Sequence, residues 1–151
     1  WATLRFNFRG VGDSEGEHSG GSGEAADAAA AVKFLTSRQD VQPQTAVLAG
    51  YSFGAMAAAL AAPEISQLGA LVLVALPLRM GNGAAALKNF NQPIVFAAGD
   101  HDLYCAASQL EALHQDLAPR SQLRIIAGAD HFFGGYEEEL ASALAVMMRA
   151  L

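Results

Sequence analysis

Ser52 stands in a sequence setting that suits nucleophilic chemistry. It is the middle residue of Gly-Tyr-Ser-Phe-Gly at 50–54, after an apolar run at 45–49 and before a helix-forming run at 55–61. A strand, a tight turn of the form Gly-x-Ser-x-Gly and a helix together lift a serine hydroxyl above the edge of a sheet. Serine is a weak nucleophile at neutral pH, so another residue must take its proton.

Two later segments carry groups that complete a proton relay. Residues 99–102 read Gly-Asp-His-Asp, and residues 128–134 read Gly-Ala-Asp-His-Phe-Phe-Gly. His131 titrates near neutral pH, so its imidazole can accept the serine proton and later return it. A carboxylate on the other ring nitrogen would fix the tautomer and stabilise the imidazolium. Asp102 and Asp100 compete as this carboxylate, and the alternative role of Asp100 is to cap a turn.

The elements expected around these residues alternate between strand and helix. Strands are expected at residues 2–8, 45–49, 70–76, 93–98 and 122–127. Helices are expected at residues 24–37, 53–62 and 106–117 and from residue 137 onward, with one helical turn within 78–92. This alternation predicts an α/β fold: a doubly wound, mainly parallel sheet of about five strands flanked by helices, in a single domain over residues 1–151. Functional residues of such sheets follow the carboxyl ends of strands, where Ser52, Asp102 and His131 all lie.

On these residues the chain resembles the α/β-hydrolase superfamily, whose triad runs Ser, Asp, His along the chain. Within it, residues 4–16 (Leu-Arg-Phe-Asn-Phe-Arg-Gly-Val-Gly-Asp-Ser-Glu-Gly) are similar to a small bacterial group of lidless serine hydrolases related to dienelactone hydrolases. Further blocks that match this group in order are residues 23–27, 50–55, 99–102 and 128–133. The resemblance extends over essentially the whole chain.

The resemblance implies a serine hydrolase that cleaves carboxylic esters or thioesters through an acyl-enzyme. It implies Ser52 as nucleophile, His131 as base, Asp102 as the triad acid and the backbone N–H of Phe53 as an oxyanion donor. Dienelactone hydrolases usually carry cysteine at the elbow, so the serine favours plain ester chemistry. The short connection at 78–92 leaves no room for a large lid, so the expected substrate is a small-molecule ester.

The front of the chain departs from the pattern of this group. Its members normally have two or three strands before the one expected at residues 2–8, and one of them leads into a loop that donates a second oxyanion N–H. We find no such loop in the sequence, and losing one oxyanion donor costs about 100- to 1000-fold in turnover. We therefore expect a truncated fold with weak activity and an exposed sheet edge through which a second copy pairs to form a homodimer. The alternative function is a catalytically silent hydrolase-fold module with a binding role or no enzymatic role.

The bulk composition excludes several classes of partner. Nine basic residues oppose fifteen acidic ones, the net charge is −6, and the basic residues form no cluster. Nucleic acid and anionic membranes are therefore not expected as partners. No apolar stretch approaches the roughly 20 residues that span a bilayer, and we expect no signal peptide. The single Cys105 allows no internal disulfide, which fits a cytoplasmic protein.

Neither a metal nor a nucleotide cofactor is expected. His101, Asp102 and His131 lack the spacing of a zinc site. Gly10 and Gly12 follow an expected strand, as in a dinucleotide-binding loop, but the third glycine of that motif is missing at the required place.

Three further side chains near these motifs have competing interpretations. Arg9 is expected to bind Glu24 or Asp27 as structural support, and a substrate-facing role is the alternative. Phe132 and Phe133 are expected to pack against the core, and the alternative is that one of them lines the acyl pocket.

Overall fold

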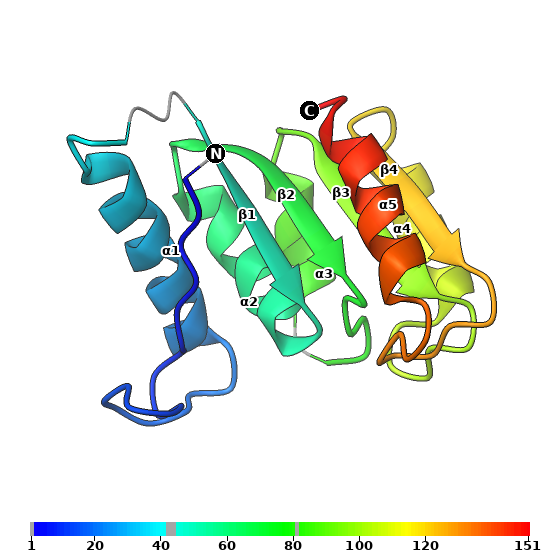
Figure 1. The fold of residues 1–151 in the computed structure, drawn as a ribbon, viewed down its shortest axis with the longest axis horizontal. Coiled ribbons are helices and arrows are strands. Elements are labelled where there is room, and N and C mark those ends of the chain that lie inside the picture. The colour runs from blue at the N-terminus through cyan, green and yellow to red at the C-terminus, as the bar shows by residue number, and fades with distance from the viewer. Residues whose placement is uncertain (1, 42–44, 81) are drawn as a thin grey trace.

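The computed structural model describes residues 2–41, 45–80 and 82–151 and shows strands alternating with helices (Figure 1). The strands are β1 (Ala46–Tyr51), β2 (Leu68–Val74), β3 (Ile94–Gly99) and β4 (Ser121–Ile126). The α-helices are α1 (Ser22–Ser37), α2 (Phe53–Ala61), α3 (Gly83–Ala86), α4 (Ala107–Asp116) and α5 (Glu137–Met148). Short 3-10 helices follow α2 and α3, at Ala62–Glu64 and Leu87–Asn89.

All described strands belong to one parallel sheet in the order β1-β2-β3-β4. Parallel pairing places the carboxyl ends of the strands along a single edge, which is the lower edge in Figure 1. The segments that follow β1, β3 and β4 therefore all leave the sheet on the same side. These are the segments that contain the candidate site residues.

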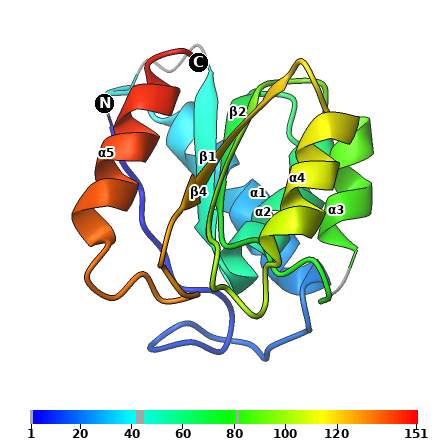
Figure 2. The same ribbon diagram turned by 90° about the vertical axis from the view of Figure 1, so that its right-hand side faces the viewer.

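Helices cover both faces of the sheet, as the prediction of a doubly wound α/β fold requires. Helix α5 lies alone on one face, and α1 to α4 lie on the other (Figure 2). Along β2, Leu71 and Leu73 face the four-helix side, and Val72 and Val74 face α5. The continuous apolar run that predicted this strand thus reflects burial on both faces.

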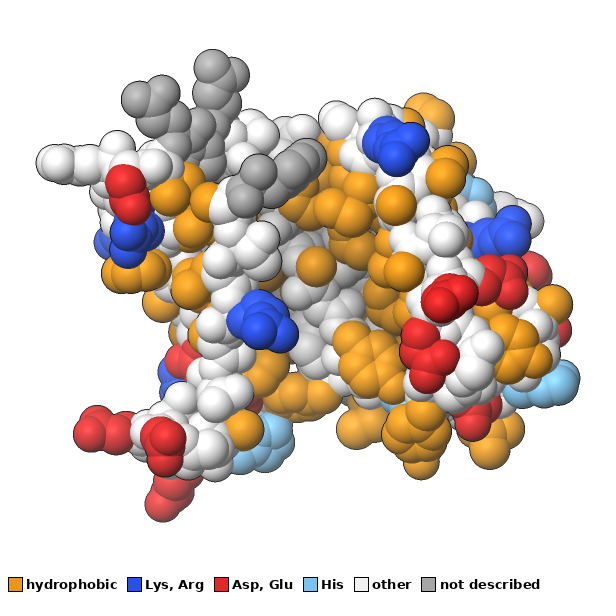
Figure 3. All heavy atoms as spheres, viewed as in Figure 1, with side chains coloured by type: hydrophobic (Ala, Val, Ile, Leu, Met, Phe, Trp, Pro, Cys, Tyr) orange, Lys and Arg blue, Asp and Glu red, His pale blue; other side chains and the backbone are white. Residues whose placement is uncertain are grey.

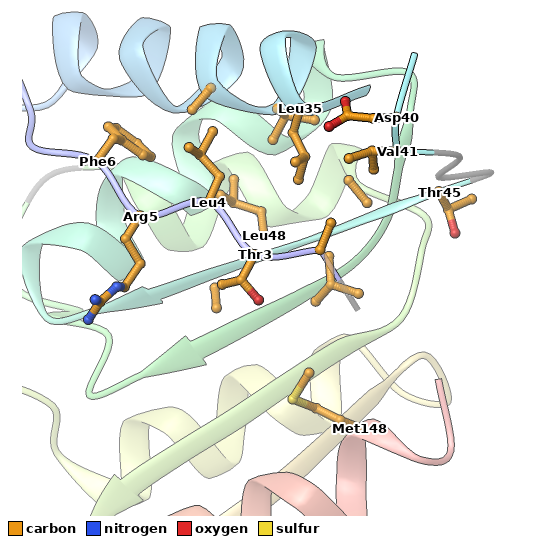
Figure 4. A pocket seen from close by; sticks show the side chains of 16 residues that line it. Thr3, Leu4, Arg5, Phe6, Leu35, Asp40, Val41, Thr45, Leu48 and Met148 are labelled. Atoms are coloured by element: carbon orange, nitrogen blue, oxygen red, sulfur yellow. The ribbon is translucent and has the colours of Figure 1, made fainter. Parts of the chain in front are cut away.

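The prediction of a strand at residues 2–8 is wrong. This segment runs along α1 without pairing to any described strand, so the described sheet has four strands rather than five. A cavity of about 660 Å³ lies between residues 2–6 and β1, bounded also by α1 and by Met148 of α5 (Figure 4). The residue pattern of this segment expresses strand propensity, but a strand forms only where a neighbour supplies the hydrogen bonds of a ladder.

The edge of β1 that faces this cavity pairs with no other strand of the described residues. Unpaired strand edges promote association between chains. The sequence-based expectation that a second copy pairs here stays a prediction. Sedimentation velocity over a range of concentrations checks it, and a monomer at every concentration would contradict it.

Among the helices of the described residues, none has the length and apolarity that crossing a bilayer requires.

Candidate active site

Ser52 occupies a sharp turn between β1 and α2. Its φ of 52° and ψ of −120° lie in a region that non-glycine residues rarely adopt, and its N–H donates to the carbonyl of Val74 in β2 at 2.9 Å. A side chain at Gly50 would collide with the carbonyl of Gly54, so the turn can close only with glycine at 50. The turn places the hydroxyl at the carboxyl edge of the sheet.

The side chains of Ser52, His131 and Asp102 form a continuous hydrogen-bonded chain. The Oγ of Ser52 lies 2.8 Å from Nε2 of His131, and Nδ1 of His131 lies 2.8 Å from Oδ2 of Asp102. The imidazole is 9% exposed, and the carboxylate is fully buried. Because a carboxylate only accepts, Nδ1 carries the proton, which leaves Nε2 free to accept the hydroxyl proton of Ser52.

Asp102 is held by the turn that it begins. Its Oδ1 accepts the backbone N–H groups of Tyr104 and Cys105, each at 2.8 Å, which leaves Oδ2 for the imidazole. Cys105 is buried beneath this turn, and burial raises the pKa of its thiol to about 12. The thiol is therefore protonated at neutral pH and is not a competing nucleophile.

Asp100, the competing acid, does not contact the imidazole. Its Oδ1 accepts the N–H of Gly128 at 2.7 Å, which joins the loop after β3 to the loop after β4. These loops approach closely because residue 99 is glycine: a Cβ on Gly99 would collide with the carbonyl of Ala129. Asp100 therefore supports the arrangement in which Asp102, two residues later, meets His131.

Tyr51 fixes the loop that carries His131, a role that the sequence analysis missed. The Tyr51 hydroxyl donates to the carbonyl of His131 at 2.7 Å, and the two rings lie 5.6 Å apart. Burial, and then the charges of Asp102 and Asp130, raise the pKa of Tyr51, so the phenol stays protonated and remains a donor. The sequence signal for this role is the position of Tyr51. It directly precedes the elbow serine and is the last residue of β1, so it lies beside the site.

Phe53 opens α2, directly after Ser52. The first N–H groups of a helix have no acceptor within the helix, so the N–H of Phe53 is open to a developing negative charge beside Ser52. The ring of His18 lies 5.1 Å from the Phe53 ring, so the loop that ends before α1 lies against the elbow.

Arg9 has the structural contact that the sequence analysis favoured, and its partner is Asp27. Its Nη2 donates to Oδ1 of Asp27 at 2.7 Å, and its backbone N–H donates to Oδ2 at 3.0 Å. These bonds fasten the chain after residue 8 to α1. Hydrogen bonding to Arg9 holds the pKa of the Asp27 carboxyl below its usual range.

The side chain of Glu24 binds the loop at residues 18–21, which leads into α1. Its side chain is fully buried and accepts the N–H groups of Ser19 at 2.8 Å and Gly21 at 2.7 Å, and it also accepts from the Ser19 hydroxyl and pairs with His18. Chiefly because of the Ser19 N–H, and against the opposing effect of burial, the pKa of Glu24 falls to about 2. The loop beside the elbow is thus built around a charged carboxylate.

The low pKa of Glu24 makes stability depend on pH. A carboxyl whose pKa is lower in the folded than in the unfolded chain stabilises the fold above its unfolded pKa, and this contribution disappears as pH falls toward the folded pKa. Glu24→Gln should therefore lower the melting temperature at pH 7, and the gap from wild type should shrink between about pH 5 and pH 3. Thermal melts followed by circular dichroism measure this gap. Glu138→Gln, on the exposed first turn of α5, is the control, and an equal gap at pH 3 and pH 7 would contradict the assignment.

Among the described residues, no group of three or more histidine, cysteine, aspartate or glutamate side chains has an arrangement that could hold a metal ion. The groups that the structure brings together at the edge of the sheet are the hydroxyl, the imidazole and the carboxylate, together with the N–H of Phe53.

Comparison with known proteins finds similarity over most of the chain. Residues 15–147 match the dienelactone hydrolase family. An uncharacterised protein of Rickettsia prowazekii is 31% identical over 154 residues, a match that covers 95% of this chain and 63% of that protein.

Two solved structures share the fold. An α/β serine hydrolase homologue from Coxiella burnetii is 33% identical, with a TM-score of 0.82 over 93% of this chain and 65% of its own. An α/β serine hydrolase without a lid from Xanthomonas campestris is 26% identical, with a TM-score of 0.79 over 97% of this chain and 65% of its own. The chain thus spans just under two thirds of the length of these relatives.

Proposed function

We propose that this chain, which belongs to the dienelactone hydrolase family, hydrolyses carboxylic esters or thioesters through an acyl-enzyme. The observation that carries the proposal is the unbroken hydrogen-bonded chain from the Ser52 hydroxyl through His131 to Asp102. A hydroxyl, an imidazole and a buried carboxylate in this order are the parts that acyl transfer requires.

The first half of the reaction acylates Ser52. As Oγ attacks the carbonyl carbon of the ester, its proton passes to Nε2 of His131, and Asp102 stabilises the resulting imidazolium. The carbonyl oxygen becomes negative, and the N–H of Phe53 supplies one hydrogen bond to it. The tetrahedral intermediate then expels the alcohol, which takes the proton from Nε2.

The second half releases the acid. Water gives a proton to Nε2 of His131 and attacks the acyl carbon, and the bond to Oγ breaks as Ser52 recovers its proton. No electron donor or acceptor takes part. The reaction therefore needs only the residues named here, the substrate and water.

A fluorophosphonate probe tests the proposal directly, because it labels only an activated serine. We expect one covalent adduct on Ser52 by peptide mass spectrometry, together with turnover of p-nitrophenyl acetate above the rate in buffer. A folded protein that neither reacts with the probe nor releases p-nitrophenol would instead be the catalytically silent module that the sequence left as the alternative.

A further inference from the structure

Large apolar side chains surround the candidate triad and are exposed to water. Among the exposed apolar residues of the described chain, four lie within two positions of Ser52, Asp102 or His131. They are Tyr51, Leu103, Tyr104 and Phe132, with exposed fractions of 45%, 85%, 51% and 73%, and we call them the collar. Apolar side chains also gather along the lower rim in Figure 3, where the strands end.

The contrast between Phe132 and its neighbour shows that this exposure is local. Phe133 is buried against the α5 face of the sheet, as the sequence analysis expected. Phe132 points into solvent instead, so the expectation that it packs in the core is wrong. Burying a phenylalanine or leucine side chain stabilises a fold considerably, so side chains that the fold leaves in water can gain this free energy from a ligand.

The backbone holds the collar in place around the imidazole. The N–H of Tyr104 donates to Asp102, and the N–H of Phe132 donates to Oδ1 of Asp130 at 2.9 Å. The rings of Tyr104 and Phe132 have their centroids 4.7 Å and 5.4 Å from that of His131. The apolar surface of the collar therefore begins directly beside the base, on loop segments that backbone hydrogen bonds hold.

The direction of proton transfer identifies which part of the substrate meets this surface. The leaving alcohol takes its proton from Nε2 of His131, so its oxygen must come within hydrogen-bond reach of that nitrogen. The oxyanion forms on the other side of the reacting carbon, toward the N–H of Phe53. The alcohol portion of the ester therefore lies beside the imidazole and against the collar.

The charges of the surrounding loops disfavour an anionic alcohol. Residues 100–106 and 127–136 contain Asp100, Asp102 and Asp130 but neither lysine nor arginine. The charges of Asp102 and Asp130 act on the collar itself, since they contribute to the raised pKa of Tyr51. These aspartates would repel a carboxylate on a leaving group that lies against the collar.

We propose that the collar is a subsite for the alcohol portion of the ester and selects alcohols that are apolar and uncharged. This inference rests on the proposed function and adds the substrate class to it. Leu103 and Phe132 are the specificity-determining residues, because their side chains have the largest exposed fractions in the collar.

Hexyl acetate and ethyl acetate test the proposal, because they share the acyl group and differ only in the length of the alcohol. Each methylene that enters an apolar site is worth about fourfold in kcat/KM, so we expect wild type to prefer hexyl acetate by at least about tenfold. Leu103→Ala/Phe132→Ala should bring this ratio to within about twofold of unity. Phe34→Ala removes an exposed phenylalanine from α1 and should keep the wild-type ratio. Titration of the released acid at constant pH measures all six rates, for two esters with each of the three proteins.

Three results would overturn the proposal. The first is a ratio that the double variant leaves unchanged. The second is a fall in kcat/KM for ethyl hexanoate in the double variant that equals the fall for hexyl acetate. This result would place the subsite on the acyl side. The third is a wild-type dimer that the double variant converts to monomer in sedimentation, which would make the collar an interface between copies.

Charge selectivity is tested with phenyl acetate and 4-carboxyphenyl acetate. We expect 4-carboxyphenyl acetate to be hydrolysed at least about tenfold more slowly than phenyl acetate. Asp130→Asn should reduce this difference between the two rates. Equal rates would refute the selection against anionic alcohols. Turnover of ethyl acetate without either preference would overturn the collar assignment alone. Absence of turnover and of fluorophosphonate labelling would overturn the proposed function and the collar with it.

Discussion

Replacing Ser52 with alanine is expected to lower the kcat for p-nitrophenyl acetate by at least about ten-thousand-fold. The change removes the only atom that forms the acyl bond, whereas Nε2 of His131, 2.8 Å away, and the N–H of Phe53 remain. The residual rate above buffer then measures what binding and one oxyanion donor achieve without a nucleophile. Labelling by the fluorophosphonate probe should disappear completely.

A matched control separates loss of the nucleophile from loss of a serine elsewhere. Ser142→Ala removes an exposed hydroxyl from α5 and should leave both turnover and labelling at the wild-type level. Circular dichroism checks that both variants are folded. If the Ser52→Ala variant kept the wild-type rate, another group would be the nucleophile and the acyl-enzyme route through Ser52 would be refuted.

The parallel sheet could be predicted because its signals are local. β2 reads as an apolar run without polar interruption, and the elbow reads as a strand, a glycine-flanked serine and a helix. Residues 2–8 carried a similar strand signal and nevertheless form no strand. Propensity belongs to the segment itself, whereas pairing depends on what lies next to it, and the sequence pattern of residues 2–8 contains no information about a neighbour.

The candidate triad could be predicted in outline for a related reason. Parallel strands bring their carboxyl ends together, so residues after β1, β3 and β4 had to meet. The choice between Asp100 and Asp102 depends on how one tight turn folds, in which Oδ1 of Asp102 accepts the backbone N–H groups of Tyr104 and Cys105. The exposure of Phe132 beside the buried Phe133 likewise follows from the course of a loop, because Phe133 has a φ of +55° that redirects the chain.

Asp102→Asn is expected to lower kcat by about ten-thousand-fold while the fold is retained. The amide oxygen of asparagine can still accept the N–H groups of Tyr104 and Cys105 that now bond to Oδ1, so the turn should keep its shape. The amide nitrogen, however, then faces Nδ1 of His131 and donates to it. The imidazole must move its proton to Nε2 and can no longer accept one from Ser52.

Asp100→Asn is the matched control, since the same atom is exchanged two residues away. Its amide oxygen can still accept the N–H of Gly128, and Asp100 has no contact with the imidazole, so kcat for p-nitrophenyl acetate should fall by less than about tenfold. The kcat of both variants at pH 8 is measured together with their melting temperatures. A low kcat at an unchanged melting temperature indicates a wrong tautomer of His131, and a lowered melting temperature indicates a loosened loop. If Asp100→Asn caused the larger loss at an unchanged melting temperature, the acid of the relay would be Asp100, and the hydrogen bond between Asp102 and His131 would have only a structural role.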